Sequence, residues 1–105
     1  MAIANAQLIA TDKTVVFDAT GENAITCMIF CNTSSDTDST ISVWVVPAAQ
    51  PAGPANMVIK DVLLPAGETF SMDTERFILS DSDTIQAQAS QDTIVTVTVS
   101  YVQTG

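Results

Sequence analysis

The chain has 105 residues, 47% of them apolar, and a net charge of −9 from three basic and twelve acidic residues. Because no cluster of Lys or Arg is present, we expect it to bind neither nucleic acid nor an anionic membrane surface. The length suits one domain spanning residues 1–105. The chain contains no histidine, the commonest general base and metal ligand, so we expect no enzyme activity, no cofactor and no metal.

Apolar and polar residues alternate along most of the chain, and turn-forming residues interrupt the pattern about every 8–12 positions. This pattern is typical of an all-β fold, an antiparallel β-sandwich that is either Ig-like or jelly-roll-like. It predicts about eight or nine short strands and no helix. The expected strands are residues 7–10, 14–18, 24–31, 40–46, 57–64, 68–72, 76–79, 83–89 and 93–102.

The last two predicted strands alternate most clearly. Residues 85, 87 and 89 form one apolar face, and so do residues 95, 97, 99 and 101. We expect both sets to point into the core. The link of residues 90–92 is short, which predicts a hairpin between these two strands.

Cys27 and Cys31 lie on one predicted strand, together with Ile25 and Ile29. Four residues of a strand span about 13 Å, whereas a disulfide needs its Cα atoms within roughly 7 Å. We therefore expect two free thiols, which suits assembly in a cytoplasm. We expect both cysteines to be small buried residues on the same face as the two isoleucines.

Two pairs of carboxylates crowd into predicted turns, Asp36 with Asp38 and Asp81 with Asp83. Such oxygens can bind calcium, but neither pair has the glutamate spacing of an EF-hand. We expect solvated turns, and we expect residues 80–83 to cap the turn before residue 85 by side-chain to backbone hydrogen bonds. Paired carboxylates also occur in glycosidases, but a single Trp and a single Tyr provide few sugar platforms.

Two predicted strands are apolar on both faces. Met28 and Phe30 lie opposite one apolar set, and Trp44 and Val46 lie opposite another. In an isolated two-layer sandwich the outer face should be polar. We therefore expect these four residues to form an interface with another chain. The alternative is a third covering layer or a small closed barrel.

Three segments in this order resemble a family of small virion structural proteins of tailed bacteriophages. They are IFCNTS at 29–34 with TISVWVVP at 40–47, IKDVLLPAGET at 59–69, and DTIQAQA at 83–89 with VTVSY at 97–101. One departure is Ser82, where the family pattern usually has glycine. The resemblance implies a β-sandwich subunit of the virion, assembled in the host cytoplasm.

Small size, acidity, missing catalytic residues and apolar faces favour a capsid cement (decoration) protein that binds and stabilises the shell of major capsid protein. We also expect a homo-oligomer. The alternatives are a neck or head–tail connector, a tail accessory protein and, in a different class, a carbohydrate-binding module.

Overall fold

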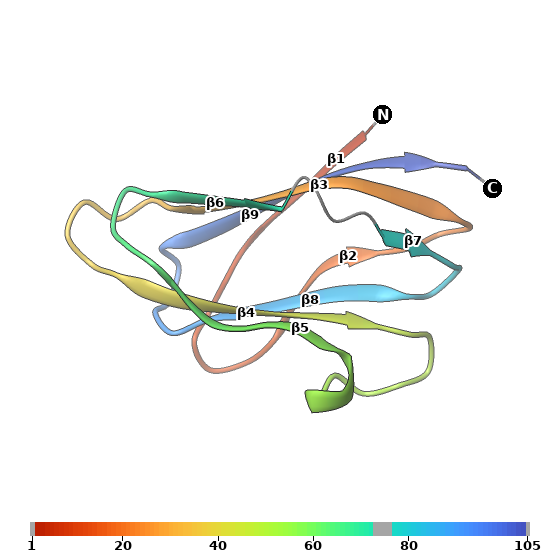
Figure 1. The fold of residues 1–105 in the computed structure, drawn as a ribbon, viewed down its shortest axis with the longest axis horizontal. Coiled ribbons are helices and arrows are strands. Elements are labelled where there is room, and N and C mark those ends of the chain that lie inside the picture. Colours follow the sequence, from red (N-terminus) through yellow and green to blue (C-terminus); the bar gives the residue numbers. More distant parts are fainter. Residues whose placement is uncertain (1, 73–76, 105) are drawn as a thin grey trace.

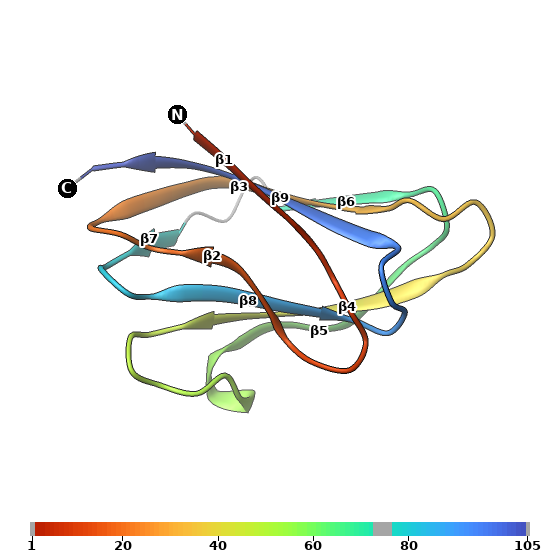
Figure 2. The ribbon, with the colours of Figure 1, turned by 180° about the vertical axis from the view of Figure 1, so that it is seen from behind.

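The computed structural model describes residues 2–72 and 77–104, and this part of the chain forms nine strands and one short 3-10 helix, η1. Two antiparallel sheets pack face to face, as Figures 1 and 2 show, so the predicted β-sandwich is confirmed. The elements are β1 (Ala2–Gln7), β2 (Thr14–Asp18), β3 (Asn23–Asn32), β4 (Ser39–Val46), η1 (Pro54–Asn56), β5 (Met57–Leu64), β6 (Thr69–Met72), β7 (Phe77–Leu79), β8 (Thr84–Ala89) and β9 (Val95–Gln103).

The two sheets share one pairing rule. Sheet A has the order β1-β9-β3-β6, with β7 also paired to β3, and sheet B has the order β2-β8-β4-β5. The first four strands thus pair in reverse order with the later ones: β1 with β9, β2 with β8, β3 with β6 and β7, and β4 with β5. A long hairpin rolled up in this way is a jelly roll, which decides between the two sandwich types left open above.

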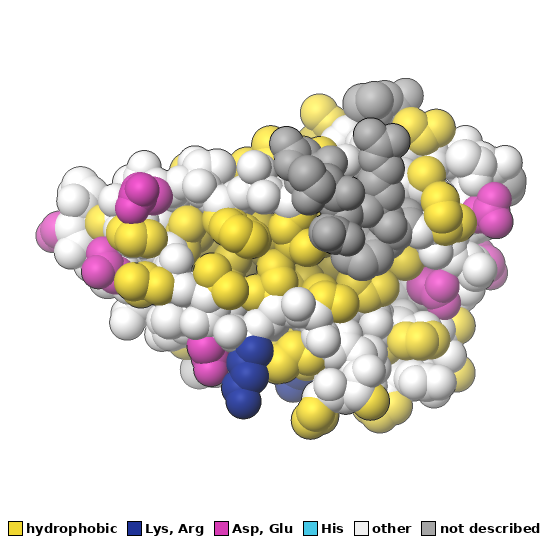
Figure 3. Space-filling view, in the orientation of Figure 1, with side chains coloured by type: hydrophobic (Ala, Val, Ile, Leu, Met, Phe, Trp, Pro, Cys, Tyr) yellow, Lys and Arg dark blue, Asp and Glu magenta, His cyan; other side chains and the backbone are white. Residues whose placement is uncertain are grey.

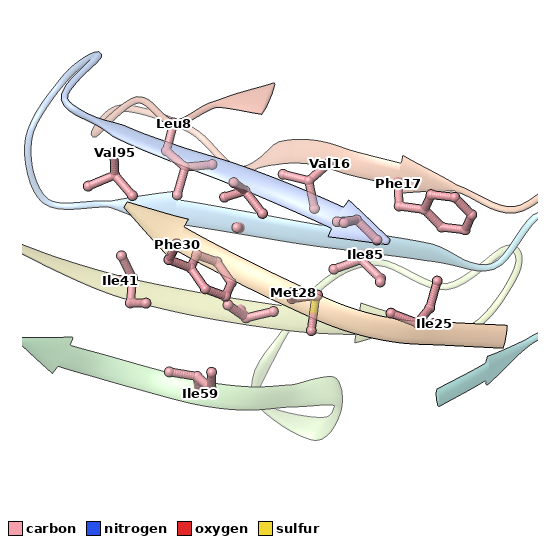
Figure 4. Close-up of a cluster of buried hydrophobic side chains, with 14 of the residues drawn as sticks. Leu8, Val16, Phe17, Ile25, Met28, Phe30, Ile41, Ile59, Ile85 and Val95 are labelled. Carbon is pink, nitrogen blue, oxygen red and sulfur yellow. The ribbon is translucent and has the colours of Figure 1, made fainter. Parts of the chain in front are cut away.

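The core lies between the sheets and is built from alternating residues. Val95, Val97 and Val99 of β9 are buried, as are Ile85 and Ala87 of β8, which confirms the faces predicted for these strands. Figure 4 shows side chains from both sheets meeting in this layer. Burial of aliphatic side chains stabilises the fold by about 1.5–3 kcal/mol each.

The predicted hairpin between β8 and β9 is wrong, because the two strands lie in different sheets. The link contacts the β1–β2 connection instead. The Thr93 N–H donates to the Leu8 carbonyl at 2.9 Å, and the Asp92 carboxylate accepts from the Ala10 N–H at 2.7 Å. A period of two reveals which face of a strand is buried but not which strand it pairs with.

The N-terminal strand also differs from the prediction: β1 covers Ala2–Gln7 rather than residues 7–10. The predicted strand 76–79 appears as β7, and its first residue, Arg76, lies outside the described residues.

An irregularity in β3 reverses the faces expected for this strand. The register with β9 shifts between Ile25 and Cys27, as a β-bulge requires. Ile25 points inward before the shift, and Met28 and Phe30 point inward after it. Cys27 therefore lies on the outer face.

The outer face of β4 is covered by the chain itself. Trp44 and Val46 point outward from sheet B, yet their exposed fractions are only 5% and 2%. The Lys13 Nζ lies 4.9 Å from the Trp44 ring centroid. The helix η1 contacts β4 and, in Figure 1, lies on the outer side of sheet B. The covering layer considered above is therefore present at this position.

Candidate interaction surface

The four residues expected at an interface are all buried within the chain. Met28 and Phe30 project from β3 into the core, where Figure 4 shows both among the labelled buried side chains. Trp44 and Val46 point outward from β4 but are buried within the chain, and η1 contacts this strand. The expectation that these side chains face another chain is therefore not met, because a bulge turns the first pair inward and a loop covers the second.

The outer face of sheet A is open, as is part of the outer face of sheet B, where Val15, Val58 and Leu63 are exposed. The residues of the sheet A face follow from the register, since Val95, Val97 and Val99 point inward and directly opposed residues share a face. We call this outer face of sheet A the uncharged face. It comprises Ile3, Asn5, Gln7, Ala24, Cys27, Ile29, Cys31, Thr69, Ser71, Ile78, Thr96, Thr98, Ser100 and Val102.

No Asp, Glu, Lys or Arg occurs in any strand of sheet A, although the chain carries a net charge of −9. Ile3, Ile29 and Ile78 of the uncharged face have exposed fractions of 67%, 39% and 64%. Most carboxylates lie in the loops. Figure 3, which views the sandwich from the side, shows acidic side chains mainly towards the two ends of the long axis. The strands of sheet A therefore offer a surface without charged side chains, while the described carboxylates lie mainly in the loops.

The crowded carboxylates have hydrogen-bond partners within the chain, as predicted for residues 80–83. The N–H groups of Ala48 and Ser80 each donate to the Asp83 carboxylate at 2.8 Å, and the Gly21 N–H donates to Asp81 at 2.9 Å. The other two are similarly engaged, Asp38 by the Ala66 N–H at 2.9 Å and Asp36 by the Ser34 and Thr37 hydroxyls at 3.1 Å. Within residues 2–72 and 77–104 no group of three or more potential ligand side chains could hold a metal.

Both cysteines have free thiols in the structure, as predicted. They are only half-buried, however, and they lie on the uncharged face, with Cys27 opposite Ser100 and Cys31 opposite Thr96. The prediction of buried cysteines beside Ile25 is wrong because the β3 bulge separates Ile25 from the residues after it.

A hollow of about 230 Å³ on the outer side of sheet B is lined mostly by polar side chains. Its polar side chains already have partners within the chain. Ser42 accepts from the Asp61 N–H at 3.1 Å, Ser90 accepts from the Thr40 N–H at 2.8 Å, and Gln88 donates to a backbone carbonyl. These bonds join β4 to β5 and to the end of β8, and they join β8 to the β1–β2 connection, so the polar side chains of the hollow already serve the fold.

The single Trp and the single Tyr do not form an exposed platform. Trp44 is buried, and Tyr101 is half-buried against Phe17, with ring centroids 4.6 Å apart. This arrangement gives the carbohydrate-binding alternative no stacking surface from these two rings.

Comparison with known proteins identifies no relative of this chain. No family model matches the chain, and searches of the curated proteins and of the solved structures find no significant match. Among the described residues, no helix has the length and apolarity to cross a bilayer.

Proposed function

We propose that this chain is a non-enzymatic structural subunit of a tailed-bacteriophage virion, and specifically a capsid cement protein that binds the shell of major capsid protein. The observation that carries the proposal is the uncharged face of sheet A, with exposed Ile3, Ile29 and Ile78 in an otherwise acidic protein. The phage assignment comes from the three segments that resemble virion proteins.

The uncharged face suits binding to another protein for a physical reason. Burying an unpaired charge costs several kcal/mol, and the centres of protein interfaces are depleted of charged residues. Docking through sheet A would bury isoleucine, threonine and serine side chains. The acidic loops at the ends would stay hydrated.

The topology is compatible with this role, because jelly rolls occur in viral capsid and lectin domains. Fold alone does not determine function, and the site must decide. The buried Trp44 favours a protein partner over a sugar. A neck or tail subunit would use the same kind of surface and differ in its place on the particle.

The test uses an antibody against the chain on purified virions of the phage that encodes it. Labelling over the whole head is expected for a cement protein. Labelling confined to the neck or tail would show a neck or tail component instead of a cement protein. Unlabelled virions would overturn the proposal.

Binding to particles stripped of the protein locates the surface. Ile29→Glu places a charge at the centre of the uncharged face, and we expect it to weaken binding by at least about tenfold, since an unpaired charge would be buried. Leu63→Glu is the matched control, because Leu63 is 59% exposed on β5 of sheet B. Circular dichroism checks that both variants fold. If only Leu63→Glu loses binding, sheet A is not the docking surface.

A further inference from the structure

The strand β1 is a free edge of sheet A, and its backbone groups can be assigned a direction. The Leu8 N–H donates to the Val95 carbonyl at 2.9 Å, in the register that pairs β1 with β9. In an antiparallel ladder, alternate residues bond to the neighbouring strand. Residues 4 and 6 therefore bond to β9, whereas Ile3, Asn5 and Gln7 direct their N–H and C=O groups away from the sheet.

The other edges carry features that obstruct pairing with another strand. In sheet B, β2 has an irregularity after Val15 and ends at Asp18, and β5 has shifted register around Lys60 and Asp61. The Asp61 φ of 50° lies in the left-handed region. The opposite edge of sheet A consists of two short strands, β6 and β7.

The strand β1 has no such feature. It pairs with β9 in continuous register over Ala2–Gln7 and contains no proline and no charge. Its exposed side chains include Ile3. Figure 2 shows β1 running along the near side of the sandwich, with no strand between it and the viewer. Among the described edges, β1 is thus the one best suited to accept a further strand.

We propose that a second copy of this chain pairs with β1 along this edge, antiparallel across a two-fold axis at Asn5. Asn5 of one copy then lies opposite Asn5 of the other, and Ile3 lies opposite Gln7. All outward N–H and C=O groups of these three residues gain partners, and the two A sheets become one continuous sheet. This pairing does not depend on the virion role and would operate in any assembly.

Charge argues for a second copy as the occupant. Two chains of charge −9 repel each other, so copies can meet closely only where carboxylates are absent. The strands β1, β9 and β3 satisfy this condition. At a two-fold axis a charged residue would oppose itself, whereas the Asn5 amide can both donate to and accept from its counterpart.

The repulsion also predicts the effect of salt. Screening of the acidic loops should strengthen association of two identical copies as ionic strength rises. A basic partner on the same acidic protein would bind more weakly under the same change.

Sedimentation equilibrium of the purified chain over a range of concentrations tests the proposal. We expect a dimer that dissociates on dilution and tightens between low and high salt. Asn5→Pro removes an N–H that points away from β9, so it spares the intrachain ladder and removes the two central bonds of the dimer. We expect this variant to weaken the dimer by about tenfold or more.

Thr98→Lys is the matched control, because Thr98 lies directly opposite Asn5 on the same face but on β9, inside the sheet. It should leave the dimer largely intact. A strictly monomeric wild type, or a dimer lost in Thr98→Lys and kept in Asn5→Pro, would overturn the proposal. Asn5→Lys provides a second edge variant should the proline variant fail to fold. Particle binding is measured separately, so that virion attachment and dimerisation can fail independently.

Discussion

Replacing Trp44 with alanine tests whether this side chain stabilises the fold or an interface. In the structure Trp44 is 5% exposed on the outer side of β4, beneath Lys13 and the segment containing η1. We therefore expect Trp44→Ala to destabilise the isolated chain, because it removes a large ring from beneath a covering loop.

The size of the effect can be estimated from the burial. Buried Trp→Ala changes cost about 3–5 kcal/mol, and a surface loop can partly collapse into the space, which favours a value of about 3 kcal/mol. A domain of this size loses about 4–8 °C of Tm per kcal/mol, so the Tm should fall by about 12–24 °C. Lys13→Ala removes only the cation–π contact and should cost about 0.5–1 kcal/mol.

The assay is chemical denaturation, with unfolding of the variants monitored by circular dichroism. In the wild type, tryptophan fluorescence reports directly on Trp44, since it is the single Trp. Its emission should be blue-shifted and protected from acrylamide. If Trp44→Ala keeps wild-type stability but no longer associates, Trp44 lies at an interface and the burial argument fails.

Three further measurements check local features. Gly67→Ala should lower the free energy of unfolding by about 1 kcal/mol, because Gly67 has φ +76° in the turn closed by the hydrogen bond from the Glu68 N–H to the Pro65 carbonyl. Gly53→Ala, the control, should leave the stability nearly unchanged, and equal unfolding midpoints for the two variants would contradict this reasoning. Asp83→Ala should lower the free energy of unfolding by about 2 kcal/mol and Asp81→Ala by about 1 kcal/mol, because the first change removes two hydrogen bonds and the second removes one. If urea denaturation found Asp81→Ala to be the less stable variant, this assignment would be refuted. Thiol titration of the denatured protein without reductant should label both cysteines, and a mass two units lower with no labelling would show a disulfide.

The sequence predicts strands best where one face is buried and the other is solvated. The alternation in β8 and β9 identifies their inward faces, and the predicted range 57–64 matches β5 (Met57–Leu64). Pairing partners are harder to predict, because β8 and β9 have similar patterns and yet belong to different sheets. The link at 90–92 is held by contacts to residues that are distant in sequence: Ser90 bonds to Thr40, and Asp92 bonds to Ala10.

The candidate surface is poorly predicted for a related reason. One extra residue in β3 moves Met28 and Phe30 inward and turns Cys27 and Ile29 outward, and no local signal announces a bulge. Trp44 is buried by parts of its own chain that period-two patterning does not reveal: Lys13, from the β1–β2 connection, lies over its ring, and η1 contacts β4. The strands of sheet A contain no charged residue, but this pattern can be recognised only once the structure shows which strands belong to that sheet.

The rolled hairpin has a consequence for synthesis. The strand β1 emerges early from the ribosome, but its partner β9 is made last among the described strands, with Ala2 paired to Tyr101. Such long-range pairings make folding slow and postpone it until most of the chain is available. The uncharged face draws on β1, β3, β6, β7 and β9, so it does not exist in an incomplete chain. If sheet A is the docking surface proposed above, a chain that lacks β9 cannot present it.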